Sequence, residues 1–335
     1  MRLLHYRLPE SGSLRIGAAW PSGAVVDVRR LLANHCGVSD VPRSLVEHVL
    51  LAGTIDELLH GGELAALGRA LASCERRYGE GSLQLDARTL LPEGSVEVSH
   101  PVRRPGKMLS VGRNFYDHLD ESISLWADRG RPIKPPSDPT GFIKLRSSLA
   151  EPCGVVVKHP DVNQLDYEVE LAVVIGKRAF CIEPEAAGAC VAGYSVILDL
   201  ADRATQRLDQ EMLSSATGKN LPTFAPMGPA LVTPDEVAAL DDQTIKLWVN
   251  GDLRQSSTLG NMICKVDEAV AHYSQMGLDP GDVILMGTPA GVAIAKPDPE
   301  PYFVRSGDRM EAEISRIGRL SVTVADGPAP LGLVG

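Results

Sequence analysis

The 335-residue sequence lacks an excess of basic residues. Its 33 Lys and Arg are outnumbered by 43 Asp and Glu, which gives a formal net charge of -10. Because binding to phosphate backbones requires a basic surface, this charge argues against nucleic acid as the main partner. A small anionic substrate is still compatible with it, provided that Arg and Lys side chains gather locally.

The sequence also lacks an uninterrupted apolar run close to the ~18 residues that a membrane helix needs. The segment Met1–Arg7 has no apolar core of the signal-peptide kind. No CxxC pair, phosphate-loop pattern or dinucleotide fingerprint occurs. The six cysteines are scattered, at positions 36, 74, 153, 181, 190 and 264. We therefore expect a cytoplasmic protein with reduced cysteines and no membrane partner.

The composition, 44% apolar and 23% charged, is that of a globular protein large enough for one or two domains. Short alternating segments within residues 1–30 predict a small antiparallel sheet. Residues 42–58 and 63–78 have a helical pattern, and Pro101–Pro105 is typical of a linker. We predict a small N-terminal accessory domain, residues 1–100, followed by a catalytic domain, residues 101–335.

Two acidic residues lie inside an apolar stretch, Leu165–Gly176, that predicts a buried strand. In a strand, the side chains of Glu168 and Glu170 project from the same face, ~7 Å apart. Burying two like charges costs several kcal/mol for each, so a cationic group must lie close by. A divalent metal ion held by oxygen ligands accounts for the pair with few assumptions.

A third ligand is offered by Asp199, which ends the apolar run Val191–Leu198. Three carboxylates without a nearby His or Cys favour Mg²⁺, Mn²⁺ or Ca²⁺ over zinc. The alternative interpretation is a salt-bridged strand in which Lys177 or Arg178 neutralises the acids.

A candidate base follows a short strand-like segment that begins at Lys107. His118 and Glu121 are three residues apart on a predicted helical turn, where the carboxylate would raise the basicity of the imidazole. An ordinary ion pair on a helix surface is the alternative. Residues 122–140 are rich in turn-forming residues and predict either a lid over a substrate or a surface loop.

Further polar residues follow Asp199. A helix beginning there would place Arg203 and Gln206 on the same face as Asp199. Lys219 is either a lysine whose head reaches solvent or a group that steadies an oxyanion. Thr288 lies in a Gly-rich turn, residues 287–291. Downstream, Asn250-Gly251 predicts a hairpin, residues 264–277 a helix, and residues 306–324 strands.

Taken together in chain order, these motifs resemble the fumarylacetoacetate hydrolase family, from about residue 107 to the C-terminus. The motifs that carry the resemblance are Gly112–His118 with Glu121, Asp166–Leu171, Val191–Tyr194 with Asp199, Arg203 and Gln206, Gly218-Lys219, Met227–Pro229, Val249–Gly251, Pro280–Asp282 and Gly287–Gly291. The resemblance implies a mixed, β-rich α+β fold, with a catalytic domain built as a β-roll or β-sandwich of packed sheets. It further implies Mg²⁺ or Mn²⁺ at Glu168, Glu170 and Asp199, and a homodimer.

The chemistry that the resemblance implies is metal-dependent hydrolysis of a carbon–carbon bond in an acylpyruvate or 1,3-diketo acid. His118, oriented by Glu121, would activate water, while the metal stabilises the departing enolate. Lys219 would hold the oxyanion. The residues expected to bind substrate are Arg113, Tyr116, Lys144, Arg203, Gln206 and Thr288.

The sequence departs from the family pattern at Tyr167, where Trp is usual, and at Asp202 and Ala204 on either side of Arg203. Alternatives within the same fold are a 2-oxo acid decarboxylase or a hydratase-isomerase, since enolate stabilisation serves those reactions too. A non-catalytic binding protein stabilised by metal is a further alternative from a different class.

Overall fold

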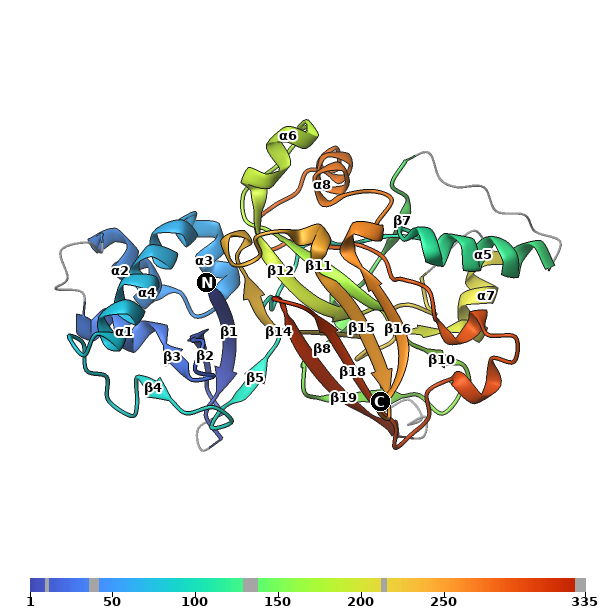
Figure 1. Cartoon of the computed structure of the whole chain (residues 1–335), viewed down its shortest axis with the longest axis horizontal. Coiled ribbons are helices and arrows are strands. Elements are labelled where there is room, and N and C mark those ends of the chain that lie inside the picture. Colours follow the sequence, from blue (N-terminus) through green and yellow to red (C-terminus); the bar gives the residue numbers. More distant parts are fainter. Residues whose placement is uncertain (10–11, 36–41, 129–137, 212–215, 329–335) are drawn as a thin grey trace, which may run out of the picture.

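The structure is a computed structural model that describes residues 1–9, 12–35, 42–128, 138–211 and 216–328. Figure 1 shows the N-terminal strands and helices side by side with a larger body of packed sheets. The mixed, β-rich α+β architecture predicted from the sequence is confirmed. None of the described helices has both the length and the apolar character needed to cross a membrane.

The larger of the sheets runs through both parts of the molecule, in the order β4-β3-β2-β1-β14-β12-β11-β17-β6-β7. Strand β5 pairs with β1, and β8 pairs with β14. Its strands are β1 (Arg2–Arg7), β2 (Leu14–Ala19), β3 (Val25–Asp27), β4 (Leu90–Leu91), β5 (Glu97–Ser99), β6 (Met108–Val111), β7 (Gly141–Ile143), β8 (Leu149–Ala150), β11 (Val169–Ile175), β12 (Val191–Leu198), β14 (Ala225–Val232) and β17 (Val283–Leu285). The predicted N-terminal antiparallel sheet is therefore continuous with the sheet of the larger body, through the pairing of β1 with β14.

A second sheet packs against the large one, in the order β16-β15-β18-β19-β9. Its strands are β9 (Val155–Lys158), β15 (Thr244–Val249), β16 (Asp252–Thr258), β18 (Arg309–Ile314) and β19 (Gly318–Asp326). Strand β15 alternates between buried and partly exposed residues, as expected for a sheet with one wet face. The predicted Asn250-Gly251 hairpin joins β15 to β16, and both turn residues have positive φ. A small separate pair consists of β10 (Leu165–Asp166) and β13 (Ala201–Asp202).

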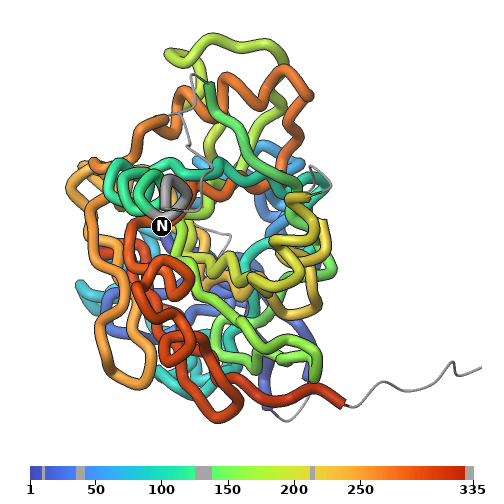
Figure 2. The backbone as a smooth tube through the Cα atoms, turned by 90° about the vertical axis from the view of Figure 1, so that its right-hand side faces the viewer, coloured from blue at the N-terminus to red at the C-terminus, as the bar shows by residue number. Residues whose placement is uncertain are grey.

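The described helices lie outside these sheets. They are α1 (Val28–His35), α2 (Arg43–Leu51), α3 (Ile55–Gly61), α4 (Leu64–Gly79), α5 (Tyr116–Asp128), α6 (Pro184–Ala187), α7 (Arg203–Glu211) and α8 (Val266–Ser274). In Figure 2, which looks onto the right-hand side of Figure 1, α5 in green and α7 in yellow both lie on the side that faces the viewer. These two helices carry several of the predicted site residues.

Strands β11 and β12 are buried on both faces. Leu171 and Val173 of β11 belong to the core shared with the second sheet. Ala172 and Val174 belong to a second core, which also contains the apolar side chains of α1 to α4. A strand covered on both faces is apolar along its whole length, which explains the continuous apolar runs in the sequence.

Three predicted elements differ from the structure. Residues 42–58 form two helices, because the chain bends at Gly53 and Thr54 then caps α3 by accepting a hydrogen bond from the Glu57 N–H. The predicted loop 122–140 begins with helix, since α5 continues to Asp128. Residues 129–137, which make up nine of the nineteen residues of the lid prediction, lie outside the described residues.

The predicted strand Leu165–Gly176 is also interrupted. Tyr167 and Glu168 separate β10 from β11, so Glu168 is not within a strand, and Glu170 is the second residue of β11.

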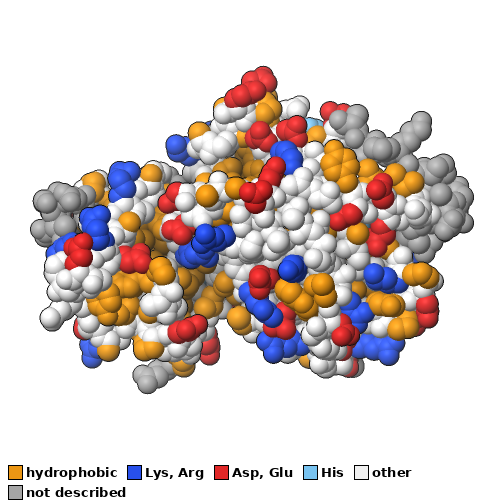
Figure 3. All heavy atoms as spheres, in the orientation of Figure 1, with side chains coloured by type: hydrophobic (Ala, Val, Ile, Leu, Met, Phe, Trp, Pro, Cys, Tyr) orange, Lys and Arg blue, Asp and Glu red, His pale blue; other side chains and the backbone are white. Residues whose placement is uncertain are grey.

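Figure 3 shows acidic and basic side chains interspersed over the surface that it displays. That surface therefore has no extended basic area of the kind that binds nucleic acid.

Candidate active site

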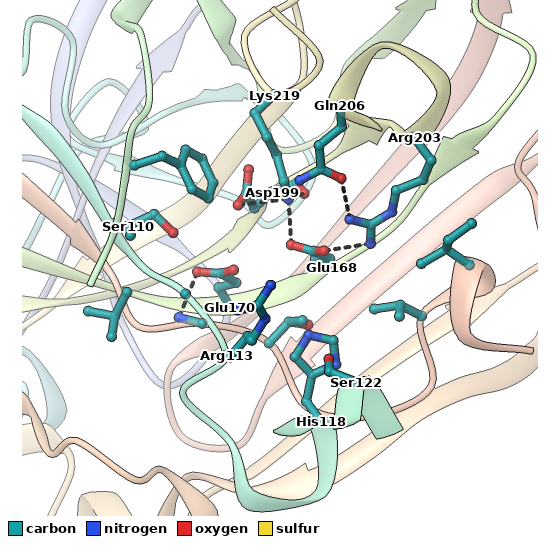
Figure 4. A pocket seen from close by; sticks show the side chains of 18 of the residues that line it. Ser110, Arg113, His118, Ser122, Glu168, Glu170, Asp199, Arg203, Gln206 and Lys219 are labelled. Carbon is teal, nitrogen blue, oxygen red and sulfur yellow. Dashed lines mark hydrogen bonds and ion pairs between the residues drawn. The ribbon is translucent and has the colours of Figure 1, made fainter. Parts of the chain in front are cut away.

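The predicted metal ligands come together where one end of β11 lies beside one end of β12. Strands β11 and β12 are antiparallel, with Val169 opposite Leu198, so the start of β11 meets the end of β12. Asp199 directly follows β12, and its N–H donates to the Glu168 carbonyl over 2.9 Å. Glu168, Glu170 and Asp199 each offer a carboxylate oxygen within 4.8 Å of the others, and all three side chains are buried. Figure 4 shows the three carboxylates around one cavity.

Three cationic side chains surround these acids. Lys219 Nζ lies 2.5 Å from Glu168 and 3.0 Å from Asp199, and Lys144 Nζ lies 2.6 Å from the other Asp199 oxygen. Arg203 Nη2 lies 2.6 Å from Glu168. Neither Lys177 nor Arg178, the partners proposed from the sequence, pairs with these acids among the described ion pairs; Arg178 instead lies 3.7 Å from Asp279.

The cations act unequally on the three carboxyl groups. Burial raises the pKa of Glu168, but Lys219 and Arg203 outweigh that effect and hold the pKa at about 2. Burial raises the pKa of Glu170 well above its ordinary value, and the neighbouring charges of Asp199 and Glu168 raise it further. Glu168 is therefore neutralised by its ion pairs, whereas Glu170 has no ion-pair partner among the residues that the structure describes.

The pKa values of the two buried lysines, Lys219 and Lys144, shift in opposite directions. Burial lowers the pKa of Lys219, but the charges of Asp199 and Glu168 more than compensate, so its pKa is raised. Burial lowers the pKa of Lys144, and Asp199 offsets only part of this. The Lys219 side chain is buried, so the prediction that its head could reach solvent is wrong.

Hydrogen bonding leaves part of this cluster unsatisfied. Neither carboxylate oxygen of Asp199 accepts a well-aligned hydrogen bond from the described residues, although the two ammonium nitrogens lie within ion-pair distance. Glu170 accepts one from the Gly287 N–H, at 2.8 Å. Buried oxygens with free lone pairs suit a cation. The donor set, three carboxylates, fits a hard divalent ion such as Mg²⁺ or Mn²⁺.

Arg203 is fixed in place by a residue that the sequence reasoning did not single out. Asp166 accepts from Arg203 Nε at 2.7 Å and from the backbone N–H groups of Ala293 and Ile294, at 2.7 and 3.0 Å. Arg203 in turn donates to Gln206 Oε1 at 2.8 Å. Since α7 begins at Arg203, the predicted placement of Arg203 and Gln206 on one helical face is confirmed, but Asp199 precedes the helix.

His118 and Glu121 lie on successive turns of α5 and contact each other. His118 Nδ1 lies 3.3 Å from Glu121 Oε2. Glu121 also accepts the Gly291 N–H with both oxygens, at 3.1 and 3.2 Å. The side chains are only 13% and 19% exposed, so the pair is not an ordinary ion pair on a helix surface. With Nδ1 facing Glu121, the Nε2 atom of His118 is left to exchange a proton.

The Gly287–Gly291 turn donates hydrogen bonds both to Glu170 of the acid cluster and to Glu121 behind His118. Gly287 has φ +80°, and a Cβ there would lie 2.8 Å from the Asn114 Cβ. Gly291 has φ +108°, and a Cβ there would lie 2.2 Å from the Arg254 carbonyl oxygen. Only glycine therefore allows the two backbone N–H groups to reach Glu170 and Glu121.

The carboxylates open into a cavity of about 320 Å³. Arg113 lies in its wall with φ +53°, and Figure 4 shows it reaching between Glu170 and His118. Among the described residues Arg113 has no ion-pair or hydrogen-bond partner, and burial lowers the pKa of its guanidinium. An exposed cation that lies in a cavity wall without a partner, held in an uncommon backbone conformation, is typical of a binding site.

Comparison with known proteins identifies the family. A model of the fumarylacetoacetate (FAA) hydrolase C-terminal domain matches residues 107–325, more than half of the chain. The chain belongs to the fumarylacetoacetate hydrolase family.

Relatives within this family carry different activities in their names. The chain is 34% identical over 322 residues to the mitochondrial oxaloacetate tautomerase FAHD2B of Bos taurus, covering 95% of this chain and 90% of the relative. It is 35% identical over 269 residues to a 2,4-didehydro-3-deoxy-L-rhamnonate hydrolase of Sphingomonas sp. (strain SKA58), covering 80% and 85%. The solved fumarylacetoacetate hydrolase of Exiguobacterium antarcticum superposes with a TM-score of 0.74 at 28% identity, covering 98% of this chain and all of that one.

Nine of the twelve site residues predicted from the family resemblance line the cavity. They are Arg113, His118, Glu168, Glu170, Asp199, Arg203, Gln206, Lys219 and Thr288. Glu121 lies behind His118. Lys144 is fully buried beneath Asp199, where it donates to the backbone carbonyl of Lys219. Tyr116 is 56% exposed and does not line the cavity.

Two further residues of this protein that lie at or near the site were not predicted from its sequence. Phe142 lies beneath Lys219, whose Nζ is 5.4 Å from the ring centroid. Gln255 lies on β16, four residues after the quoted Val249–Gly251 motif but outside it. A glutamine in a half-exposed strand has no pattern that distinguishes it. Asp166, in contrast, stood next to the predicted ligands and could have been weighed as a partner for Arg203.

Proposed function

We propose that this protein is a divalent-metal-dependent enzyme that forms the enolate of a small 2-oxo acid. The observation that carries the proposal is the buried cluster of Glu168, Glu170 and Asp199 beside a cavity, in which the Asp199 oxygens contact two ammonium groups but accept no aligned hydrogen bond from the described residues. These three residues would hold Mg²⁺ or Mn²⁺, with Ca²⁺ as a further candidate. The ion, when bound, would polarise the 2-oxo group and stabilise the enolate.

The proton transfer belongs to His118. Its side chain lines the cavity, and Glu121 orients the ring and stabilises its protonated form. Glu121 is held by the Gly291 N–H, so the pair is fixed on the side of the cavity across from Lys219. His118 can therefore remove a proton from the carbon next to the 2-oxo group and deliver it to the enolate oxygen, which gives the enol; the reverse transfer gives the keto form.

The charges of the site indicate a substrate with two negative charges. Five acids face five bases, so the charges balance, and a divalent ion would add an excess of two positive charges. The groups are Glu121, Asp166, Glu168, Glu170, Asp199, Arg113, Lys144, Arg203, Arg207 and Lys219. Arg113 has no ion-pair or hydrogen-bond partner among the described residues, whereas Arg207 donates to Gln164 Oε1 at 2.7 Å. A guanidinium binds a carboxylate through two parallel hydrogen bonds. We assign the distal carboxylate of a 2-oxo dicarboxylic acid to Arg113.

Keto–enol tautomerisation is the reaction that the site supports with the fewest groups, since it needs only the ion and one base. The tautomerase relative, which covers 95% of this chain, favours the same choice. Hydrolysis of a carbon–carbon bond, predicted from the sequence, is the second candidate. It is favoured by the hydrolase relative and by a base that can equally activate water.

One experiment separates the two reactions. The protein is stripped with chelator, reloaded with Mn²⁺ or Mg²⁺, and assayed on oxaloacetate by ultraviolet absorbance of the enol, and on acetylpyruvate in ¹⁸O-labelled water. Metal-dependent interconversion without label in an acid product supports tautomerisation. Label in the acid product supports hydrolysis, and no metal-dependent activity on either compound contradicts the proposal.

Arg113→Met tests the assignment of the second carboxylate. The variant should lose at least ~10-fold in kcat/KM on a 2-oxo dicarboxylic acid, because one charge-assisted bidentate contact is removed. Its activity on a 2-oxo monocarboxylic acid should change little. An equal loss on both compounds would show that Arg113 does not distinguish them.

A further inference from the structure

On the edge away from β12, Val169, the residue between the first two proposed metal ligands, is held by side chains instead of by a neighbouring strand. Strand β17 pairs with β11 only from Ala172 onward, so the corresponding edge of Val169 has no strand partner. The Val169 N–H donates to Gln255 Oε1 at 3.0 Å, and the Val169 carbonyl accepts from Thr288 Oγ1 at 2.9 Å. Two side chains therefore set the backbone position from which Glu168 and Glu170 project.

Gln255 also binds the glycine turn. Its Nε2 donates to Thr288 Oγ1 and to the Pro289 carbonyl, both at 2.8 Å. These partners fix the orientation of the amide, because a flipped amide would put its NH₂ group against the Val169 N–H. The side chain is 1% exposed, so no water competes for these bonds.

The turn that Gln255 holds ends on two functional groups. At one end the Gly287 N–H donates to Glu170, and at the other the Gly291 N–H donates to Glu121. Gln255 thus connects Val169, which lies between the proposed ligands Glu168 and Glu170, with the turn that orients one ligand and the acid behind His118. It does not line the cavity itself.

We propose that Gln255 is a positioning residue that, together with Thr288, fixes the geometry of the carboxylates for the divalent ion and couples them to the His118–Glu121 pair. The inference rests on the proposed function, since it concerns the same metal site. Groups that orient metal ligands from behind contribute ~10- to 100-fold to metal affinity. The contribution of Gln255 should therefore appear in metal binding, before any substrate is present.

Gln255→Glu is the sharpest variant. It keeps the size of the side chain and an oxygen for the Val169 N–H, but it places an oxygen instead of an NH₂ group against the Pro289 carbonyl. Mn²⁺ affinity, measured by calorimetry or by the Mn²⁺ paramagnetic resonance signal, should fall at least ~10-fold. Gln255→Leu removes all three bonds and should weaken Mn²⁺ binding at least as much.

The chain offers a matched control in Gln243. This buried glutamine donates to the Ala239 carbonyl at 2.6 Å and accepts from Ser315 Oγ at 2.9 Å, and it contacts no cavity residue. Gln243→Glu creates the same local conflict away from the site. It should lower the melting temperature about as much as Gln255→Glu and leave Mn²⁺ affinity within about twofold.

The outcomes are distinct. Weaker Mn²⁺ binding and a lower kcat at near-normal KM in Gln255→Glu, with normal Mn²⁺ binding in Gln243→Glu, support the inference. Equal Mn²⁺ affinity in wild type and Gln255→Glu, or an equal loss in both variants, overturns it. If the wild type itself binds no Mn²⁺, the proposed function fails, and this assignment fails with it.

Discussion

Two clusters of buried polar side chains differ in how completely they are satisfied. The junction cluster (His5, Asp56, His100 and Arg103) lies where the N-terminal strands meet the start of the larger body. His5 Nδ1 donates to the His100 carbonyl at 3.0 Å, and its Nε2 accepts the Ile55 N–H at 2.9 Å. Asp56 accepts the Arg103 and Arg104 N–H groups, at 2.9 Å each.

The acid cluster (Glu168, Glu170 and Asp199) is as buried but is incompletely bonded, since both Asp199 oxygens lack an aligned donor among the described residues. Buried polar groups cost free energy unless they are paired. The junction cluster is therefore satisfied within the fold, whereas the acid cluster keeps acceptor oxygens that a bound cation could use. Burial of polar side chains alone therefore does not indicate a binding site, whereas buried polar atoms that lack hydrogen-bond partners beside a cavity do indicate one.

Glu170→Gln should have the largest effect and would sharpen the contrast. Losing one of three anionic ligands should reduce Mn²⁺ affinity at least ~100-fold and the metal-dependent rate at least ~1,000-fold. Metal-free stability in urea should stay level or rise, because burial and the charges of Asp199 and Glu168 raise the Glu170 pKa and disfavour its charged form. A variant with wild-type Mn²⁺ affinity would remove Glu170 from the ligand set.

His118→Asn separates the base from the ion. The turnover rate should fall ~100- to 1,000-fold, because general base catalysis contributes factors of this size. Mn²⁺ affinity should stay within about twofold, since His118 is not among the three ligands. A loss of Mn²⁺ binding comparable to that of Glu170→Gln would place His118 in the metal site instead.

The buried histidine of the junction cluster, His5, should make the free energy of unfolding depend on pH. Burial lowers the His5 pKa from 6.5 to about 4. Between these values the unfolded state binds more protons, so stability is complete above pH ~6.5, falls as the pH drops, and levels off below pH ~4. The expected loss is ~3 kcal/mol, from 1.36 kcal/mol per pKa unit.

The measurement is the free energy of urea unfolding of the metal-free protein from pH 7 to pH 4. His5→Gln should show a shallower slope than the wild type, whereas His159→Gln, at a position with 48% of its side chain exposed, should match the wild type. Equal slopes for wild type and His5→Gln would mean that His5 is not held neutral.

Asp56→Asn should have the smallest effect. If it altered Mn²⁺ binding, it would contradict the separation between the junction cluster and the acid cluster. It loses charge-assisted hydrogen bonds from the backbone N–H groups of Arg103 and Arg104. Unfolding should become easier by about 2 kcal/mol, while Mn²⁺ affinity and turnover stay at wild-type values. A drop in Mn²⁺ affinity would show that the junction cluster is coupled to the active site.

Much of the site could be predicted because its residues stand in short motifs on regular elements. His118 and Glu121 share a helix, and Arg203 and Gln206 share another, so helical periodicity alone placed each pair together. Asp199 ends an apolar run, and strand ends gather at sheet edges. The wrong predictions concern chain breaks, as at Tyr167, where hydrogen bonds from distant residues override the local pattern.

The amino-acid sequence by itself determined the β-rich fold and pointed to the three acidic residues proposed as ligands and to the candidate base, because apolar periodicity and short motifs can be read directly from the sequence. Only the tertiary structure decided how these residues are satisfied: that Lys144 lies beneath Asp199, that Arg113 has no partner in the described part of the chain, and that Gln255 holds the glycine turn. Such contacts join residues distant in the chain, and their energies depend on the burial and alignment that folding creates.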